Sequence, residues 1–104
     1  MINLEKKHLD FVKATLKQYI PDHTVWLFGS RTTEKIKPYS DIDLCIITEK
    51  PLDIAIMVEL SLAFEESDLP YKIDILDWSL IKENFKKIIL EKYEIIQHGA
   101  HHEK

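Results

Sequence analysis

Two aspartates separated by a single residue are the feature of this sequence best suited to chemistry. Asp41 and Asp43 flank Ile42 at the start of a β-branched, apolar run that predicts a strand over residues 41–47. Side chains alternate between the two faces of a strand, so both carboxylates point to one face. At ~5 Å and an effective dielectric of ~20, the two charges repel by about 3 kcal/mol. A bound divalent cation would compensate for that repulsion.

A third aspartate stands in the middle of another predicted strand. Asp74 lies between Ile73 and Ile75 in a segment, residues 71–76, whose apolar neighbours should face a core. A charged side chain there must face an open site or a partner, because burying an unpaired carboxylate is costly. Carboxylate and phosphate oxygens are the ligands that Mg²⁺ prefers. We therefore predict that Asp41, Asp43 and Asp74 hold metal with a bound nucleotide.

A glycine–serine pair follows the predicted strand at residues 24–28 and completes the candidate site. Gly29 allows the backbone to approach a phosphate closely, and the hydroxyl of Ser30 can donate to phosphate oxygens. Arg31 adds a planar cation that matches phosphate geometry. These three residues are predicted to bind the nucleotide.

The elements that must position these residues alternate along the chain. Helical spacing predicts a first helix with Asn3 as its cap and Pro21 at its end, and a second between Pro51 and Pro70 that includes Leu52. Ser79 is the predicted cap of a last helix, and residues 93–97 suit either a helix or a strand. The fold class is therefore α/β (α+β), a small mixed sheet flanked by helices.

Length and composition limit the class of protein. The 104 residues suit one domain over residues 1–97 with a disordered tail at 98–104. The net charge of −4 argues against direct binding to nucleic acid, which needs a basic surface. Cys45, the lone cysteine, is interpreted as a packing residue and indicates a reducing cytoplasm. The charged first twenty residues are neither a signal peptide nor a membrane span.

The order of these motifs resembles a known family. Gly29–Ser30, ten further residues and then Asp41-Ile42-Asp43 resemble the Gly-Ser…Asp-x-Asp signature of the DNA polymerase beta-like nucleotidyltransferase superfamily. The short chain and the later Lys-Ile-Asp-Ile-Leu-Asp run look like its minimal nucleotidyltransferase (MNT) branch, and the resemblance extends from about Val25 to Asp77. It implies the polymerase beta-like fold, two Mg²⁺ ions on Asp41 and Asp43, the triphosphate on Ser30, and Asp74 near the attacking hydroxyl.

The same resemblance implies an activity and a partner. MNT antitoxins pair with HEPN toxins, so the expected reaction is Mg²⁺-dependent transfer of AMP from ATP to a hydroxyl, a tyrosine of the HEPN partner. Two alternatives stay open, a catalytically weak nucleotide-binding inhibitory subunit and a small-molecule adenylyltransferase. Where relatives often read Arg-Ala-Arg-Gly, this chain has Thr33 in place of an arginine, which favours weaker binding of the triphosphate or slower transfer. Asp77 is interpreted as a cap of the last helix.

Overall fold

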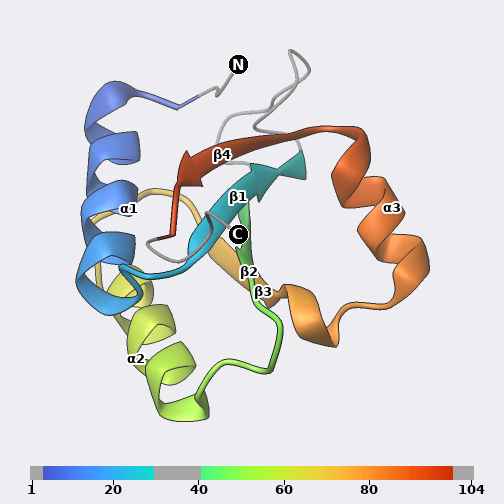
Figure 1. Cartoon of the computed structure of the whole chain (residues 1–104). Coiled ribbons are helices and arrows are strands. Elements are labelled where there is room, and N and C mark those ends of the chain that lie inside the picture. The colour runs from blue at the N-terminus through green and yellow to red at the C-terminus, as the bar shows by residue number, and fades with distance from the viewer. Residues whose placement is uncertain (1–3, 30–40, 100–104) are drawn as a thin grey trace.

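A four-stranded sheet between two layers of helices makes up the computed structural model, which describes residues 4–29 and 41–99 (Figure 1). The strand order is β3-β2-β1-β4; β2 and β3 are parallel and the other neighbours antiparallel. The predicted mixed sheet flanked by helices is confirmed. Among the described residues, none of the helices has the length and apolar character needed to cross a membrane. The elements in chain order are α1 (Lys6–Tyr19), β1 (Thr24–Phe28), β2 (Ile42–Ile47), α2 (Ile54–Glu65), β3 (Ile73–Asp77), η2 (Trp78–Leu80), α3 (Glu83–Glu91) and β4 (Tyr93–Gln97).

The larger core lies between the sheet and the helices α1 and α2. Ile42, Leu44 and Ile46 of β2 are fully buried there, as the alternation of the strand predicted. Because these three side chains occupy one face of β2, Asp43 must face the other layer. The remaining buried members of this core come from α1, β1, α2, β4 and the residue after α1, namely Val12, Leu16, Ile20, Val25, Leu27, Leu60, Phe64 and Ile96.

The opposite face of the sheet carries a smaller, mainly aromatic core under α3 and η2. Cys45 and Ile89 are fully buried there, so Cys45 packs as predicted. The Trp26 ring stacks on Tyr93, with centroids 4.0 Å apart, and meets Trp78 edge-on at 5.3 Å. This layer supports the face of β2 and β3 that carries Asp43 and Asp74.

Some of the predicted boundaries were wrong. The last helix does not begin at Ser79: residues 78–80 form a single 3-10 turn, η2, and α3 begins at Glu83 with Lys82 at its N-cap. The second helix begins after Leu52, because Asp53 accepts a hydrogen bond from the Ala55 backbone N–H at 2.8 Å and caps α2. The segment at residues 93–97, left open between helix and strand, is β4 and pairs with β1. The first helix begins at Lys6 with Glu5 at its N-cap, so the prediction of Asn3, which lies outside the described residues, as the cap was wrong.

Asp77 lies at the end of the sheet opposite Gly29 and links the β2–α2 connection to the β3–η2 connection. Its carboxylate accepts hydrogen bonds from the Leu52 N–H at 2.7 Å, from the Ser79 N–H at 2.9 Å and hydroxyl at 2.7 Å, and from the Thr48 hydroxyl. Burial alone would raise the pKa of Asp77, but these four bonds hold it below its usual value. Asp77 therefore caps η2 rather than α3, and it joins the end of β3 to the β2–α2 connection.

Candidate active site

Asp43 and Asp74 lie side by side on neighbouring strands. In the parallel pairing of β2 with β3, Asp43 is the register partner of Asp74, and register partners point to the same face. Asp41 comes immediately before β2 and is exposed. The structure therefore brings the three predicted aspartates together at the end of the sheet where β2 and β3 begin. Asp74 is 33 residues from Asp41 and 31 residues from Asp43 in the chain.

The electrostatics of Asp43 show how closely the three carboxylates interact. Partial burial is the main reason that the pKa of Asp43 is raised to about 6, and the negative charges of Asp74 and Asp41 raise it further. Lys72 lies beside these carboxylates, with its Nζ 3.9 Å from Asp74 Oδ1 and its side chain largely exposed. No other ion pair between described residues reaches Asp41, Asp43 or Asp74.

Lys72 is the residue of this site that the sequence analysis missed. It stands two positions before Asp74, so the period of two in a strand places both side chains on one face. The spacing of two between Lys72 and Asp74 could therefore have predicted a lysine beside the third carboxylate from the sequence alone. Lys72 contributes a cation beside the third carboxylate, immediately before the edge strand β3.

Gly29 brings the end of β1 directly onto Asp43. Phe28, the residue before it, is the register partner of Asp43, and Gly29 has a φ of 84°, a left-handed conformation that favours glycine. A Cβ added at Gly29 would overlap the Asp43 Oδ2 atom. The backbone at this point thus lies against the carboxylate with no room for a side chain, and the predicted contact of Gly29 with a phosphate stays a prediction. Ser30 and Arg31, the other predicted nucleotide-binding residues, lie outside the described residues, as does Thr33.

Replacing Gly29 with alanine is expected to displace the Asp43 carboxylate. The left-handed backbone costs an L-residue about 1–2 kcal/mol, and the overlap with Asp43 adds to that cost. We expect Gly29→Ala to lower AMP transfer about a hundredfold, since an error of ~1 Å in a catalytic group costs about that factor. The measurement is the transfer rate at saturating ATP. Gly99→Ala is a poor control because its Cβ meets backbone; Ser61→Ala on the exposed side of α2 should leave the rate unchanged.

The donor set fits a metal ion that is shared with a nucleotide. No group of three His, Cys, Asp or Glu side chains within residues 4–29 and 41–99 is arranged to hold an ion alone. Mg²⁺ in nucleotide sites is bound by one or two carboxylates, with phosphates and water supplying the other ligands. Asp43 and Asp74, register partners on adjacent strands with the exposed Asp41 nearby, provide such a partial ligand set.

Cys45 shares the face of Asp43 but has a different environment. It is fully buried among Phe28 and Ile89, and this burial, with the nearby charge of Asp77, raises the pKa of its thiol to about 12. A thiol of that pKa stays protonated near neutral pH and is a poor nucleophile. Covalent catalysis through Cys45 is therefore not a chemistry that this site supports.

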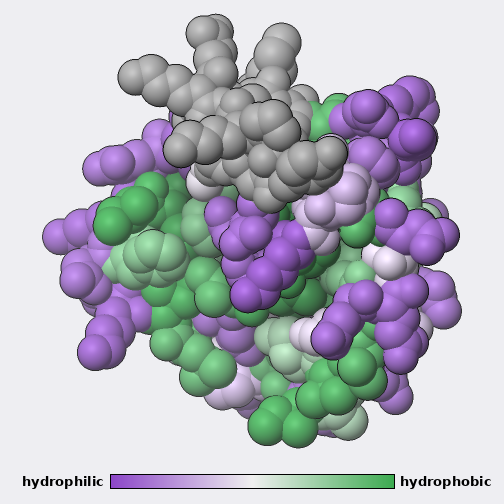
Figure 2. All heavy atoms as spheres, turned by 180° about the vertical axis from the view of Figure 1, so that it is seen from behind, coloured by the Kyte–Doolittle hydropathy of each residue, from purple (hydrophilic) through white to green (hydrophobic). Residues whose placement is uncertain are grey.

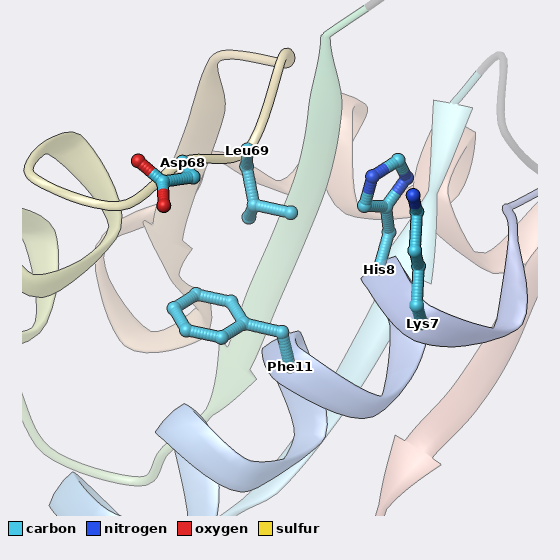
Figure 3. Close-up of a pocket in the computed structure, with 5 residues that line it drawn as sticks. All are labelled: Lys7, His8, Phe11, Asp68 and Leu69. Carbon is cyan, nitrogen blue, oxygen red and sulfur yellow. The ribbon is translucent and has the colours of Figure 1, made fainter.

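A pocket elsewhere on the molecule does not include Asp41, Asp43 or Asp74. It has a volume of about 320 Å³ and lies between α1 and the connection from α2 to β3 (Figure 3). Figure 3 shows Phe11 beneath Leu69, with Asp68 on one side of the pocket and Lys7 and His8 on the other. Since α1 packs on the face of the sheet opposite Asp43, this pocket is separate from the candidate active site.

The raised pKa of Asp43 predicts an unusual pH dependence for the metal-free protein. The folded state holds the Asp43 proton up to a pKa of about 6, whereas the unfolded chain releases it near 3.8. Stability from this group is therefore present below pH 3.8 and is lost as pH rises to about 6. We expect urea unfolding to show a loss of about 1–2 kcal/mol across this window, allowing for solvent screening.

The control for this pH effect is Asp43→Asn, which should flatten the profile between pH 4 and 6 because the titrating group is gone. Asp77 acts in the opposite sense, since its lowered pKa gives stability that is lost only as pH falls below the usual aspartate range. An Asp43→Asn profile parallel to that of the wild type would contradict the assignment of the pH effect to this carboxylate.

Comparison with known proteins identifies relatives at the level of both sequence and fold. The profile of the family described as polymerase beta, nucleotidyltransferase, matches residues 11–100. The probable protein adenylyltransferase MntA of Haemophilus influenzae is 48% identical over 96 residues, which are 92% of this chain and 84% of that protein.

Two solved structures share the fold at lower identity. A complex of a tri-AMPylated HEPN toxin of Shewanella oneidensis with MNT antitoxin gives a TM-score of 0.69 at 19% identity, and the match covers 91% of this chain and 73% of that one. A toxin–antitoxin structure with AMP-PNP gives a TM-score of 0.71 at 20% identity, covering 92% and 76%. At these identities the likeness concerns the fold.

Proposed function

Because the chain belongs to the polymerase beta nucleotidyltransferase family, we propose that it transfers AMP from ATP to a tyrosine hydroxyl of a partner HEPN toxin. The transfer, together with binding, would neutralise the toxin. The observation that carries this proposal is the pairing of Asp43 with Asp74 in register, directly beside the side-chain-free backbone of Gly29. Neighbouring carboxylates of this kind are the protein ligands that metal-assisted nucleotidyl transfer uses.

The likeness to MntA supports adenylyl transfer to a protein. That relative is a probable protein adenylyltransferase, and the sequence identity of 48% extends over almost the whole chain. The two complexes with the same fold contain, in one case, an AMPylated HEPN toxin and, in the other, the ATP analogue AMP-PNP. A HEPN toxin as acceptor and ATP as donor follow from these two likenesses as parts of the proposal. The lone buried cysteine suits a cytoplasmic encounter between them.

The described residues have separate parts in the proposed reaction. Asp41 and Asp43 would hold Mg²⁺, and bound Mg²⁺ would stabilise negative charge at the phosphates. Metal titration is the direct probe of this role. The Gly29 backbone, which lies against the Asp43 carboxylate, would help to fix the position of that ligand. Asp74 stands on the edge strand β3 with its side chain 42% exposed, so an incoming hydroxyl can reach it from solvent.

Asp74 is therefore the group that we assign to the acceptor. It would orient the tyrosine hydroxyl and accept its proton as the oxygen attacks the α-phosphorus. The new bond joins the tyrosine oxygen to phosphorus, the bond from that phosphorus to the bridging oxygen breaks, and pyrophosphate leaves with the electron pair. Lys72, beside Asp74, is placed to limit the negative charge that gathers there.

The experiment that tests this function is incubation with α-labelled ATP and Mg²⁺, with and without a HEPN toxin, for which the product of the adjacent gene is the first candidate. The control is the double variant Asp41→Asn with Asp43→Asn. Label on the neighbouring protein, lost when its tyrosines are replaced by phenylalanine and absent with the double variant, is the expected result. Binding of ATP and of the neighbour without any transfer would instead establish an inhibitory subunit, the reading that Thr33 favours.

A further inference from the structure

The outer side of α2 carries a row of apolar side chains. Ile54, Val58 and Leu62 are 78%, 51% and 45% exposed, and they follow one another at intervals of four residues. Residues four apart on a helix lie above one another, so the three side chains form a continuous ridge. Figure 2 shows hydrophobic side chains reaching the molecular surface between hydrophilic ones.

This ridge lies on the side of α2 that the fold does not use. Leu60 and Phe64 are buried against α1 and the sheet, and at 100° per residue they point away from Val58. A helix at the surface of a domain normally has polar residues on its outer side. Because α2 is apolar on both sides, its outer side has the character of a covered surface.

The charged residues of the segment that carries the ridge all have one sign. Residues 51–71 contain five acidic side chains and no Lys, Arg or His, so this segment contributes −5 to a chain whose net charge is −4, and the remainder of the chain is +1. The five acidic residues are Asp53, Glu59, Glu65, Glu66 and Asp68. None of them forms an ion pair with a described residue.

The helical positions place two of these acids beside the ridge. Glu59 and Glu66 are seven residues apart and therefore lie along one flank of it, while Glu65 lies at its C-terminal end; all three are exposed. Uncompensated like charges beside an apolar strip repel one another and attract a cationic partner. We define Ile54, Val58, Leu62, Glu59 and Glu66 as the α2 surface.

We propose that the α2 surface binds an amphipathic helix of the partner protein, one whose apolar ridge is bordered by Lys or Arg side chains. Side chains spaced by four residues on both helices interdigitate in the commonest mode of helix packing. A second copy of this chain is a poor occupant, because two-fold pairing would bring the acidic flanks of both copies together. The proposal rests on the proposed function only for the identity of the partner as the toxin.

The location of the surface agrees with a partner that is also the substrate. The ridge lies on the layer opposite the aspartates, so a helix bound there leaves their face of the sheet uncovered. The connection from α2 leads into β3, the edge strand that carries Asp74. A toxin held on α2 therefore reaches Asp74 around this edge.

The test compares the affinity of the adjacent-gene protein for matched pairs of variants. Val58→Glu with Leu62→Glu should weaken binding at least tenfold. The same change at two exposed apolar residues of α3, Ile88→Glu with Leu90→Glu, should alter it less than threefold. Glu59→Lys with Glu66→Lys should also weaken binding at low salt, whereas Glu83→Lys with Glu91→Lys, an equal change of net charge on α3, should not. Circular dichroism and ATP binding check that each variant is folded.

Several results would overturn the proposal. They are wild-type affinity in the Val58→Glu, Leu62→Glu variant, equal losses from the α2 and α3 pairs, and sedimentation showing a wild-type homodimer that this variant separates. Failure of the proposed function is distinguishable: toxin captured through the α2 surface without AMP transfer would leave this inference intact and remove the enzymatic one. AMP transfer at the wild-type rate by the Val58→Glu, Leu62→Glu variant at limiting toxin would do the reverse.

Discussion

Asp43→Asn is expected to lower AMP transfer about a thousandfold or more while making the metal-free protein more stable. Asp43 is the central carboxylate of the three, beside Gly29 on one side and Asp74 on the other, so its loss removes the proposed metal ligand that has both of these neighbours. A thousandfold loss corresponds to about 4 kcal/mol of transition-state stabilisation. Asparagine also removes a charge that is disfavoured mainly by its partial burial and further by repulsion from Asp74 and Asp41, which accounts for the gain in stability.

The two effects are measured on the same variant. Single-turnover transfer with labelled ATP gives the first, and urea unfolding at pH 7 without metal gives the second, where we expect a gain of about 1–2 kcal/mol after allowance for screening. Asp68→Asn, an exposed aspartate outside the site, is the matched control and should change neither. A loss of transfer together with a loss of stability would mean that Asp43 supports the fold, and would remove it from the metal site.

Local patterns were sufficient to predict the chemistry-bearing strand. The alternation of Asp41, Ile42 and Asp43 depends on neighbouring residues only, and the structure buries Ile42 while turning Asp43 to the other face. Gly29 was predicted in the same way from its place at a strand end. What the sequence could not supply is the register of β2 against β3, which decides that Asp43 is opposite Asp74. That register is a non-local pairing across α2.

The segments that were wrongly predicted or left open depend on contacts with distant parts of the chain. Residues 93–97 carry no decisive periodicity, and they form β4 because the free edge of β1 is available to pair. Ser79 has the side chain of a helix cap, but its hydroxyl donates to Asp77 and its backbone turns into η2 instead. Neither outcome is visible from the local residues, because both need a partner fixed elsewhere by the fold.

The α2 helix was predicted correctly, but the function proposed for its exposed side became visible only in the structure. Its apolar residues predicted a helix correctly, but Ile54, Val58 and Leu62 could not be separated from core residues until the fold showed which side is buried. The acidic segment at residues 51–71 was visible in the sequence from the start. Only the combination of an unburied ridge with that charge indicates a binding surface.

Asp77→Ala is expected to lower the free energy of unfolding by about 3–5 kcal/mol, the largest effect on stability that we predict from a side chain outside the site. The variant removes the acceptor of the Leu52 N–H, the Thr48 hydroxyl and the Ser79 hydroxyl, whereas the Ser79 N–H keeps a second acceptor, Thr48 Oγ1, at 3.1 Å. A buried donor left unpaired costs about 1–3 kcal/mol, and part of that cost is recovered when water reaches these partly buried donors.

Asp53→Ala is the matched control for this stability prediction, since Asp53 is also an aspartate cap but is exposed and accepts a single described bond, from Ala55. Losing such a cap costs about 1 kcal/mol. Urea unfolding of both variants at pH 7 makes the comparison. The difference between them should disappear as pH falls below the depressed pKa of Asp77, because the wild-type carboxylate is then protonated and accepts fewer bonds. Equal costs for the two variants at pH 7 would show that the four bonds to Asp77 add little beyond a single cap, and that the β2–α2 connection is held by its apolar contacts alone.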